Sequence, residues 1–220
     1  MKQKEKIVGK LISKSFVTSQ INTFVFKLNQ ELLFIPGQYV FLEIKGFEIK
    51  RPFSILDYDK ENETLYLGIK KHGEFTNKLW SLDLDSEVFI TGPYGRFFST
   101  NEKIVFIAGG IGITPIYNLA KNLDKNNKDC FLFYSSRSEE EMPYIKEITK
   151  LDINKTLFFT RKPSKKGLNC RISADYILKN IGAKEMYEFL ICGPKDMIDS
   201  VRNQLVKAGI SNDKIKSEVF

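Results

Sequence analysis

Residues 109–115 read GGIGITP and directly follow the apolar run IVFIA at residues 104–108. The run has the length and composition of a buried strand, and the glycines after it allow a sharp turn into a helix. Glycines at such a turn bring backbone N–H groups close to a phosphate-bearing ligand. Pro115 closes the pattern where a dinucleotide fold often carries a third glycine. The stretch therefore indicates a nucleotide-binding turn. An ordinary strand-to-helix connection is the alternative, and the rest of the sequence decides between the two.

The sequence after residue 103 alternates short apolar runs with helical patterns. We expect strands at 104–108, 131–135, 156–160, 187–192 and 214–219. Between them we expect helices at 114–123, 140–151, 173–181 and 195–208. Such alternation is typical of an α/β fold, a parallel sheet with helices on both faces.

Residues 1–99 follow a different pattern, with short β-type runs and turn residues between them. The expected strands are 7–13, 21–28, 38–44, 52–56, 64–69 and 87–91, and one helix is expected at 76–82. Closely spaced strands of this kind are typical of an antiparallel barrel or sandwich. Because the pattern changes near residues 97–103, we predict two domains, 1–99 and 100–220.

Composition places the chain among ordinary globular proteins. Of its 220 residues 42% are hydrophobic and 28% charged, and no apolar run is long enough to span a bilayer. The charged N-terminus is not followed by a secretory apolar core, so we expect a cytoplasmic protein. The net charge of +7 fits an acidic partner or an anionic ligand, although a lysine-rich composition alone produces the same value. The lysines are dispersed and no nucleic-acid-binding motif occurs, so nucleic acid is not an expected partner.

The cysteine and histidine content argues against a metal centre. Cys130, Cys170 and Cys192 are far apart and odd in number, which makes a disulfide framework improbable on spacing. An internal iron–sulfur cluster usually needs four cysteine ligands, some of them closely spaced. His72 is the single histidine and cannot build a histidine metal site. We therefore expect no metal.

Six short motifs occur in one order along the chain. They are PGQYV at 36–40, RPFS at 51–54, GEFT at 73–76, GPYG at 92–95, the glycine stretch, and CGP at 192–194. Each alone has a plain structural reading, such as a tight turn, a helix cap or an exposed arginine beside a strand. In this order they resemble the ferredoxin–NADP reductase superfamily, and the resemblance covers essentially the whole chain. It implies an antiparallel six-stranded β-barrel that binds FAD, followed by an α/β parallel-sheet domain that binds NAD(P).

The resemblance also implies which residues hold the flavin. Arg51 would meet the FAD pyrophosphate, Phe53 would pack on the flavin in place of the usual tyrosine, and Ser54 would approach flavin N5. A second family motif, a glycine followed by serine or threonine at a helix start, is matched by Gly73 and Thr76. The implied FAD-binding set is therefore Arg51, Pro52, Phe53, Ser54, Gly73 and Thr76.

The nicotinamide site is implied in the second domain. Thr114 would contact the nicotinamide end and Cys192 would lie near nicotinamide C4, although a buried structural cysteine is the common alternative. The other implied contacts are Gly110, Gly112, Gly193 and Pro194. The C-terminal pattern Glu218 and Phe220 matches plant-type relatives whose last aromatic lies over the flavin. Together with Ser54 and Cys192, these two residues form the predicted catalytic set.

The choice of coenzyme rests on the ends of two expected strands. Arg137 and Arg161 follow them, where a NAD-specific fold often places an acidic residue, so they would suit the 2′-phosphate of NADPH. Residues 139–141, all glutamates, argue in the other direction. We predict NADPH, with NADH as the alternative.

The resemblance implies an FAD-dependent NAD(P)H oxidoreductase. Hydride would pass from nicotinamide to flavin N5, and single electrons then to a small acidic protein such as ferredoxin or flavodoxin. One alternative is an NAD(P)H–flavin reductase that uses flavin as a diffusible substrate. Another is an electron-relay subunit of a larger redox complex.

Overall fold

The computed structural model describes residues 6–123 and 129–219. The chain divides into two compact units, Met1–Arg96 and Phe97–Phe220. Each unit has its own hydrophobic core.

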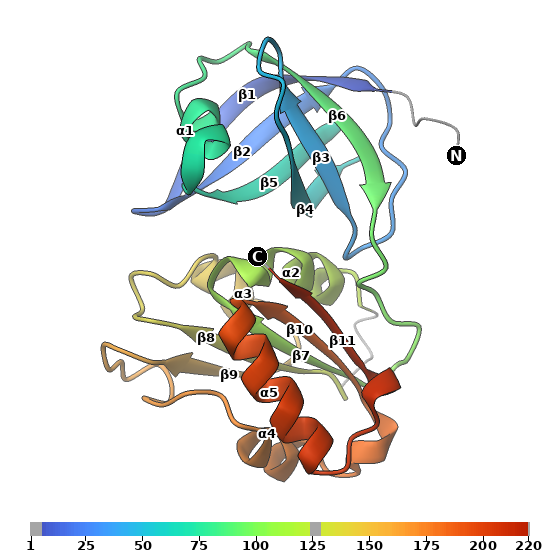
Figure 1. Cartoon of the computed structure of the whole chain (residues 1–220), viewed down its shortest axis with the longest axis vertical. Coiled ribbons are helices and arrows are strands. Elements are labelled where there is room, and N and C mark those ends of the chain that lie inside the picture. The colour runs from blue at the N-terminus through green and yellow to red at the C-terminus, as the bar shows by residue number, and fades with distance from the viewer. Residues whose placement is uncertain (1–5, 124–128, 220) are drawn as a thin grey trace. The chain divides into compact units, whose positions relative to one another are not determined.

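The first unit is a closed barrel whose strands run antiparallel in the order β1-β2-β5-β4-β3-β6 (Figure 1). This confirms the six-stranded antiparallel barrel predicted from the sequence. The helix α1 (Gly73–Trp80) begins and ends earlier than the expected 76–82. The strands are β1 (Ile7–Thr18), β2 (Ile21–Leu28), β3 (Tyr39–Ile44), β4 (Lys50–Asp59), β5 (Thr64–Lys70) and β6 (Glu87–Tyr94).

The barrel closes because alternate side chains of its strands point inward. Along β3, Val40, Leu42 and Ile44 are buried while the residues between them are half exposed. α1 adds Phe75 and Leu79 to the same core. This arrangement fixes the start of α1 and the start of β4, which carry the GEFT and RPFS motifs.

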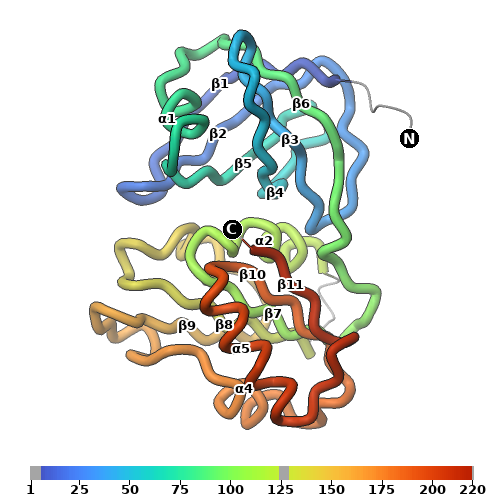
Figure 2. Tube along the Cα trace, viewed as in Figure 1, coloured from blue at the N-terminus to red at the C-terminus, as the bar shows by residue number. Residues whose placement is uncertain are grey.

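The second unit is a five-stranded sheet in the order β11-β10-β7-β8-β9, with every neighbouring pair parallel. Figure 2 shows the chain continuing from β7 to β8 and β9, then returning as β10 and β11 on the other side of β7. The strands are β7 (Ile104–Gly109), β8 (Phe131–Ser136), β9 (Asn154–Phe159), β10 (Glu188–Gly193) and β11 (Ile215–Val219).

Helices cover both faces of this sheet, as the sequence predicted. The helices α4 (Ala174–Ile181) and α5 (Lys195–Lys207) share one core with Val105, Ile107 and Phe133 (Figure 1). The helix α2 (Ile113–Lys121) packs on β7 and β10, and its buried residues lie outside that core. The parallel sheet is thus buried on both sides, which explains its continuous apolar strands.

The expected helix at 140–151 is wrong over its first half. The structure has only α3 (Ile145–Thr149), and residues 139–144 form turns in which the Met142 N–H donates to the Glu139 carbonyl at 3.1 Å. Pro143 disfavours a helical conformation at the residue before it. Tyr144 adopts a positive φ of 56°, which also interrupts a right-handed helix.

No helix in residues 6–123 or 129–219 combines the length and apolar character needed to cross a membrane.

Candidate functional site

The glycine stretch lies where the strand order of the second unit reverses. β7 and β10 are neighbours, but the chain leaves them toward opposite edges of the sheet. Open α/β sheets bind ligands outside the carboxyl ends of the strands at such a switch point. The carboxyl end of β7 leads into the 3₁₀ turn η1 (Gly110–Gly112), and that of β10 leads through Pro194 into α5. Both nucleotide motifs therefore meet at one place.

Close backbone packing joins these two segments. A Cβ added to Gly112 would lie 2.4 Å from the Cys192 carbonyl oxygen and 2.6 Å from the Gly193 nitrogen. A Cβ at Gly109 would lie 2.8 Å from Pro194 Cδ. These contacts require glycine, and they hold the helix start of η1 and α2 directly against the CGP segment.

Gly110 turns the chain from strand to helix with a φ of +54°, a region in which glycine is at no disadvantage. The first N–H groups of a helical segment have no partner within the helix. The N–H groups that start η1, which no side chain caps, therefore form a site suited to a phosphate.

Thr114 and Cys192 are both buried in the second unit. Thr114 is 1% exposed, and its hydroxyl donates to the Ile111 carbonyl at 3.1 Å. Burial raises the pKa of the Cys192 thiol well above its usual value, and the negative charge of Glu218 raises it further. The thiol therefore stays protonated at neutral pH, which argues against a nucleophilic role.

Glu218 lies beside Cys192 because the two residues are register partners of β11 and β10. Burial raises the pKa of the Glu218 carboxyl to about 7. Gly193 and Pro194 follow Cys192 at the same strand end. Phe220, the remaining predicted C-terminal residue, lies outside the described residues.

The first flavin motif lies on β4 of the barrel. Ser54 is 3% exposed, and its Oγ has no hydrogen-bond partner among the described residues. Phe53 stacks on Phe75 of α1 with ring centroids 5.9 Å apart. Arg51 and Pro52 are exposed, and the only hydrogen bond seen for the Arg51 guanidinium in the described chain goes to the Lys50 carbonyl.

The second flavin motif forms the start of α1. Gly73 has a φ of +79°, and the His72 N–H donates to Thr76 Oγ1 at 2.6 Å. The Thr76 hydroxyl in turn donates to the Gly73 carbonyl at 3.2 Å. Thr76 thus shapes the loop, while no side chain caps the helix at His72. The N–H groups of the first turn remain suited to an anion.

These features fit the FAD that the sequence implies. A buried hydroxyl without a partner is costly unless a bound group completes its hydrogen bond. Ser54 supplies such a hydroxyl, and Arg51 supplies a charge that pairs with no carboxylate in the described residues. The start of α1 supplies uncapped backbone donors.

The loops after β8 and β9 hold the cations that favoured NADPH. The Arg161 N–H donates to the Arg137 carbonyl at 3.0 Å, so the two loops lie together. Arg137 forms an ion pair with Glu141 at 3.9 Å. The sequence had placed glutamates beside Arg137, and the structure pairs one of them, Glu141, with this arginine.

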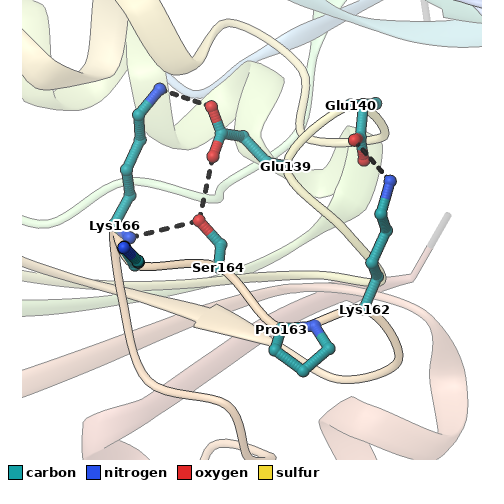
Figure 3. A pocket seen from close by; sticks show the side chains of 7 residues that line it. Glu139, Glu140, Lys162, Pro163, Ser164 and Lys166 are labelled. Carbon is teal, nitrogen blue, oxygen red and sulfur yellow. Dashed lines mark hydrogen bonds and ion pairs between the residues drawn. The ribbon is translucent and has the colours of Figure 1, made fainter.

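A pocket of about 300 Å³ lies at these loops, and Figure 3 shows the side chains that line it. In it Lys162 donates to Glu140 at 2.7 Å, and Lys166 pairs with Glu139, which also accepts from the Ser164 hydroxyl at 2.9 Å. The hydrogen bond from Lys162 lowers the pKa of Glu140 to about 2. The carboxylates are therefore charged at neutral pH, and they neutralise much of the cationic cluster.

Tyr134 is a polar residue at the site that sequence reasoning missed. It is fully buried on β8, and its hydroxyl lies 3.1 Å from the Gly110 carbonyl and 3.0 Å from the Pro143 carbonyl. A tyrosine inside an apolar strand is indistinguishable from a core residue in the sequence. Only the fold brings its hydroxyl to the glycine turn.

Comparison with known families agrees with this geometry. A model of the oxidoreductase FAD-binding domain matches residues 8–98, and one of the oxidoreductase NAD-binding domain matches residues 106–203. The chain belongs to the ferredoxin–NADP reductase superfamily. Members of this superfamily are oxidoreductases, and the two matched domains account for most of the chain.

Curated relatives include subunits of larger enzymes. A probable dihydroorotate dehydrogenase B (NAD(+)) electron transfer subunit of Pyrococcus abyssi is 42% identical over 122 residues, which are 55% of this chain and 46% of that one. The equivalent subunit of Pyrococcus horikoshii is 30% identical over 181 residues, which are 82% of this chain and 67% of that one. The first alignment thus spans about half the length of the relative.

Solved structures agree on the fold. A ferredoxin NADP+ reductase from Neisseria gonorrhoeae superimposes with a TM-score of 0.83 at 20% identity, covering 97% of this chain and 98% of that one. An identity of 20% supports a shared fold and nothing more specific.

Proposed function

We propose that this chain is an electron-transfer flavoprotein that oxidises a reduced nicotinamide coenzyme and passes the electrons to a protein partner. The observation that carries the proposal is the switch-point site, where Gly112 packs against the Cys192–Gly193 backbone beside uncapped helix N–H groups. Membership of an oxidoreductase superfamily supports the same conclusion. Bound FAD would accept hydride from the nicotinamide and release electrons singly.

We assign the flavin to the barrel. Arg51 and the N–H groups at Gly73 would hold the pyrophosphate, and Thr76 would keep the loop before α1 in shape. Phe53 would pack against the ring system, with Pro52 fixing the chain beside it. Ser54 would donate its otherwise unpartnered hydroxyl to the flavin.

We assign the nicotinamide coenzyme to the second unit. Gly110 and Gly112 would admit its phosphates, while Gly193 and Pro194 would form the opposite wall. Thr114 would shape the turn through its bond to Ile111. Cys192 and Glu218 would lie toward the reacting end of the nicotinamide, and Phe220 keeps its sequence-based role as a cover for the flavin.

The preferred coenzyme in this proposal is NADH. The sequence predicted NADPH from Arg137 and Arg161, but the carboxylates of residues 139–141 pair with the cations around them. A 2′-phosphate would have to displace these ion pairs, whereas ribose hydroxyls can donate to the carboxylates. The name of the Pyrococcus relatives, which specifies NAD(+), points the same way.

A protein acceptor is favoured because the Pyrococcus relatives are named as electron transfer subunits. The net charge of +7 would draw an acidic partner, such as a ferredoxin or flavodoxin, through steering that salt weakens. The cytoplasmic location remains a prediction from the sequence.

Flavin retention tests this proposal against the free-flavin alternative. The protein is desalted extensively, its flavin content is measured, and NADH oxidation is followed with free FMN and with a flavodoxin as acceptor. We expect close to one FAD per chain and turnover that rises with the protein acceptor. A colourless protein that reduces free flavin would instead identify a flavin reductase.

A further inference from the structure

The Tyr134 hydroxyl connects two loops that the proposed coenzyme site uses. It reaches the Gly110 carbonyl in the glycine turn and the Pro143 carbonyl in the segment before α3. A phenol has one proton to donate, so the two carbonyls share it. Because the side chain is fully buried, water does not compete for this bond.

The hydrogen bond from Tyr134 to the Gly110 carbonyl also sets the direction of the Ile111 N–H, in the same peptide group. The Gly110 carbonyl also accepts from the Ile113 N–H and is therefore held by two donors. In a planar trans peptide the carbonyl and the following N–H point in opposite directions. A Gly110 carbonyl that faces Tyr134 therefore directs the Ile111 N–H away from Tyr134.

Glycine makes this orientation easy to lose. Gly110 has a φ of +54°, and a Cβ placed on it would meet nothing within 4 Å, so local packing does not lock the turn. Glycine also populates both signs of φ readily. The Ile113 N–H holds the Gly110 carbonyl from within the turn, and the Tyr134 hydroxyl adds an anchor from outside it that keeps the Ile111 N–H in one direction.

We propose that Tyr134 is a positioning residue that fixes the Gly110–Ile111 peptide so that the Ile111 N–H is presented to the phosphates of the coenzyme. This inference rests on the proposed function, because it needs a dinucleotide at the switch point. Through Pro143 the same hydroxyl ties the glycine turn to the loop that carries Glu139 and Glu140. Tyr134 thus links the part of the site that would bind phosphate to the part that would bind ribose.

Tyr134→Phe in the flavin-loaded protein tests the proposal, with Tyr187→Phe as the matched control. Tyr187 is also buried in the second unit, but it belongs to the core on the α4 and α5 face. We measure the KM for NADH, kcat, the Kd for NAD+, flavin content and Tm. Losing one neutral hydrogen bond should raise the Kd and the KM about 3- to 10-fold in Tyr134→Phe, with kcat and flavin content nearly unchanged. The control should keep the wild-type values.

A double-mutant cycle with Gly110→Ala tests whether Tyr134 affects coenzyme binding through the Gly110 peptide. If Tyr134 acts through the Gly110 peptide, the combined loss of affinity is smaller than the product of the two single losses. Unchanged coenzyme affinity in Tyr134→Phe, an equal loss in Tyr187→Phe, fully multiplicative losses, or failure of Tyr134→Phe to fold would each overturn the proposal. A wild-type protein that neither binds nor oxidises NADH or NADPH would refute the proposed function itself.

Discussion

At the proposed coenzyme site, Gly112→Ala would improve helix propensity but would bring the new Cβ too close to neighbouring backbone atoms. Gly112 has φ −61° and ψ −4°, which any residue adopts, so alanine causes no backbone strain. In a helix interior alanine would stabilise by about 1 kcal/mol relative to glycine. However, the new Cβ would lie 2.4 Å from the Cys192 carbonyl oxygen and 2.5 Å from the carbonyl carbon. Ordinary van der Waals contact needs about 3.5 Å, so η1 and the end of β10 would have to separate by about 1 Å.

We expect packing to dominate, because the obstacle is backbone that no rotamer change can move. Overpacking of this kind costs about 1–3 kcal/mol, and each kcal/mol lowers the Tm of a domain of this size by about 4 °C. Separating the two motifs should also raise the KM for NADH at least tenfold, since a shift of about 1 Å at a binding site is strongly felt. Thermal unfolding and steady-state kinetics measure both effects.

The control is Gly182→Ala, at a glycine in the loop after α4. Its Cβ would meet nothing within 4 Å, although a φ of +70° makes alanine unfavourable there. We expect a lower Tm with an unchanged KM in this control. The reasoning would be refuted if Gly112→Ala gained stability, or kept the wild-type KM for NADH.

Three further predictions concern ionisable side chains. Arg51→Ala should weaken FAD binding at least tenfold, about 1.5 kcal/mol for a lost charge-assisted bond, and equal flavin occupancy under limiting FAD would contradict the assignment. Combining Glu139→Gln with Glu140→Gln should lower the ratio of kcat/KM for NADH to that for NADPH about tenfold or more, and an unchanged ratio would show that these carboxylates do not select the coenzyme. Burial raises the pKa of Glu218 to about 7, so the stability gained from its protonation is complete below pH 4.5 and is lost as pH rises through 7. Glu218→Gln should therefore raise stability more at pH 8 than at pH 5, by about 1–2 kcal/mol after allowing for partial exposure, whereas a Tm difference independent of pH would rule this out.

The sequence predicted the fold well where local pattern and tertiary burial agree. The expected strand 38–44 corresponds to β3, in which Val40, Leu42 and Ile44 point inward, and the expected strand 104–108 corresponds to β7, at the centre of the parallel sheet. The helix expected at 140–151 failed because Pro143 and the positive φ of Tyr144 override an apolar pattern. Local sequence pattern was therefore enough to predict these strands, but it was not enough to predict the structure of residues 140–151.

The candidate site was only partly accessible from the sequence. The glycine turn and the CGP segment could be named because their motifs are local. The ion pairs of Lys162 with Glu140 and of Lys166 with Glu139, and the bonds of Tyr134, depend on how loops meet in space, which no residue spacing encodes. The number of cations therefore led the sequence-based prediction to NADPH, whereas the ion pairs in the structure support our proposal of NADH.

The measurement that tests the central claim most directly is an anaerobic titration of the desalted protein with NADH and, separately, with NADPH, followed by its visible spectrum. The account predicts a yellow protein with a flavin absorbance near stoichiometric for one FAD per chain. About one equivalent of NADH should bleach that absorbance, at lower concentration and faster than NADPH does. A protein that carries no flavin, or whose flavin absorbance neither coenzyme changes, would contradict the claim that this chain transfers electrons from a nicotinamide to a bound FAD.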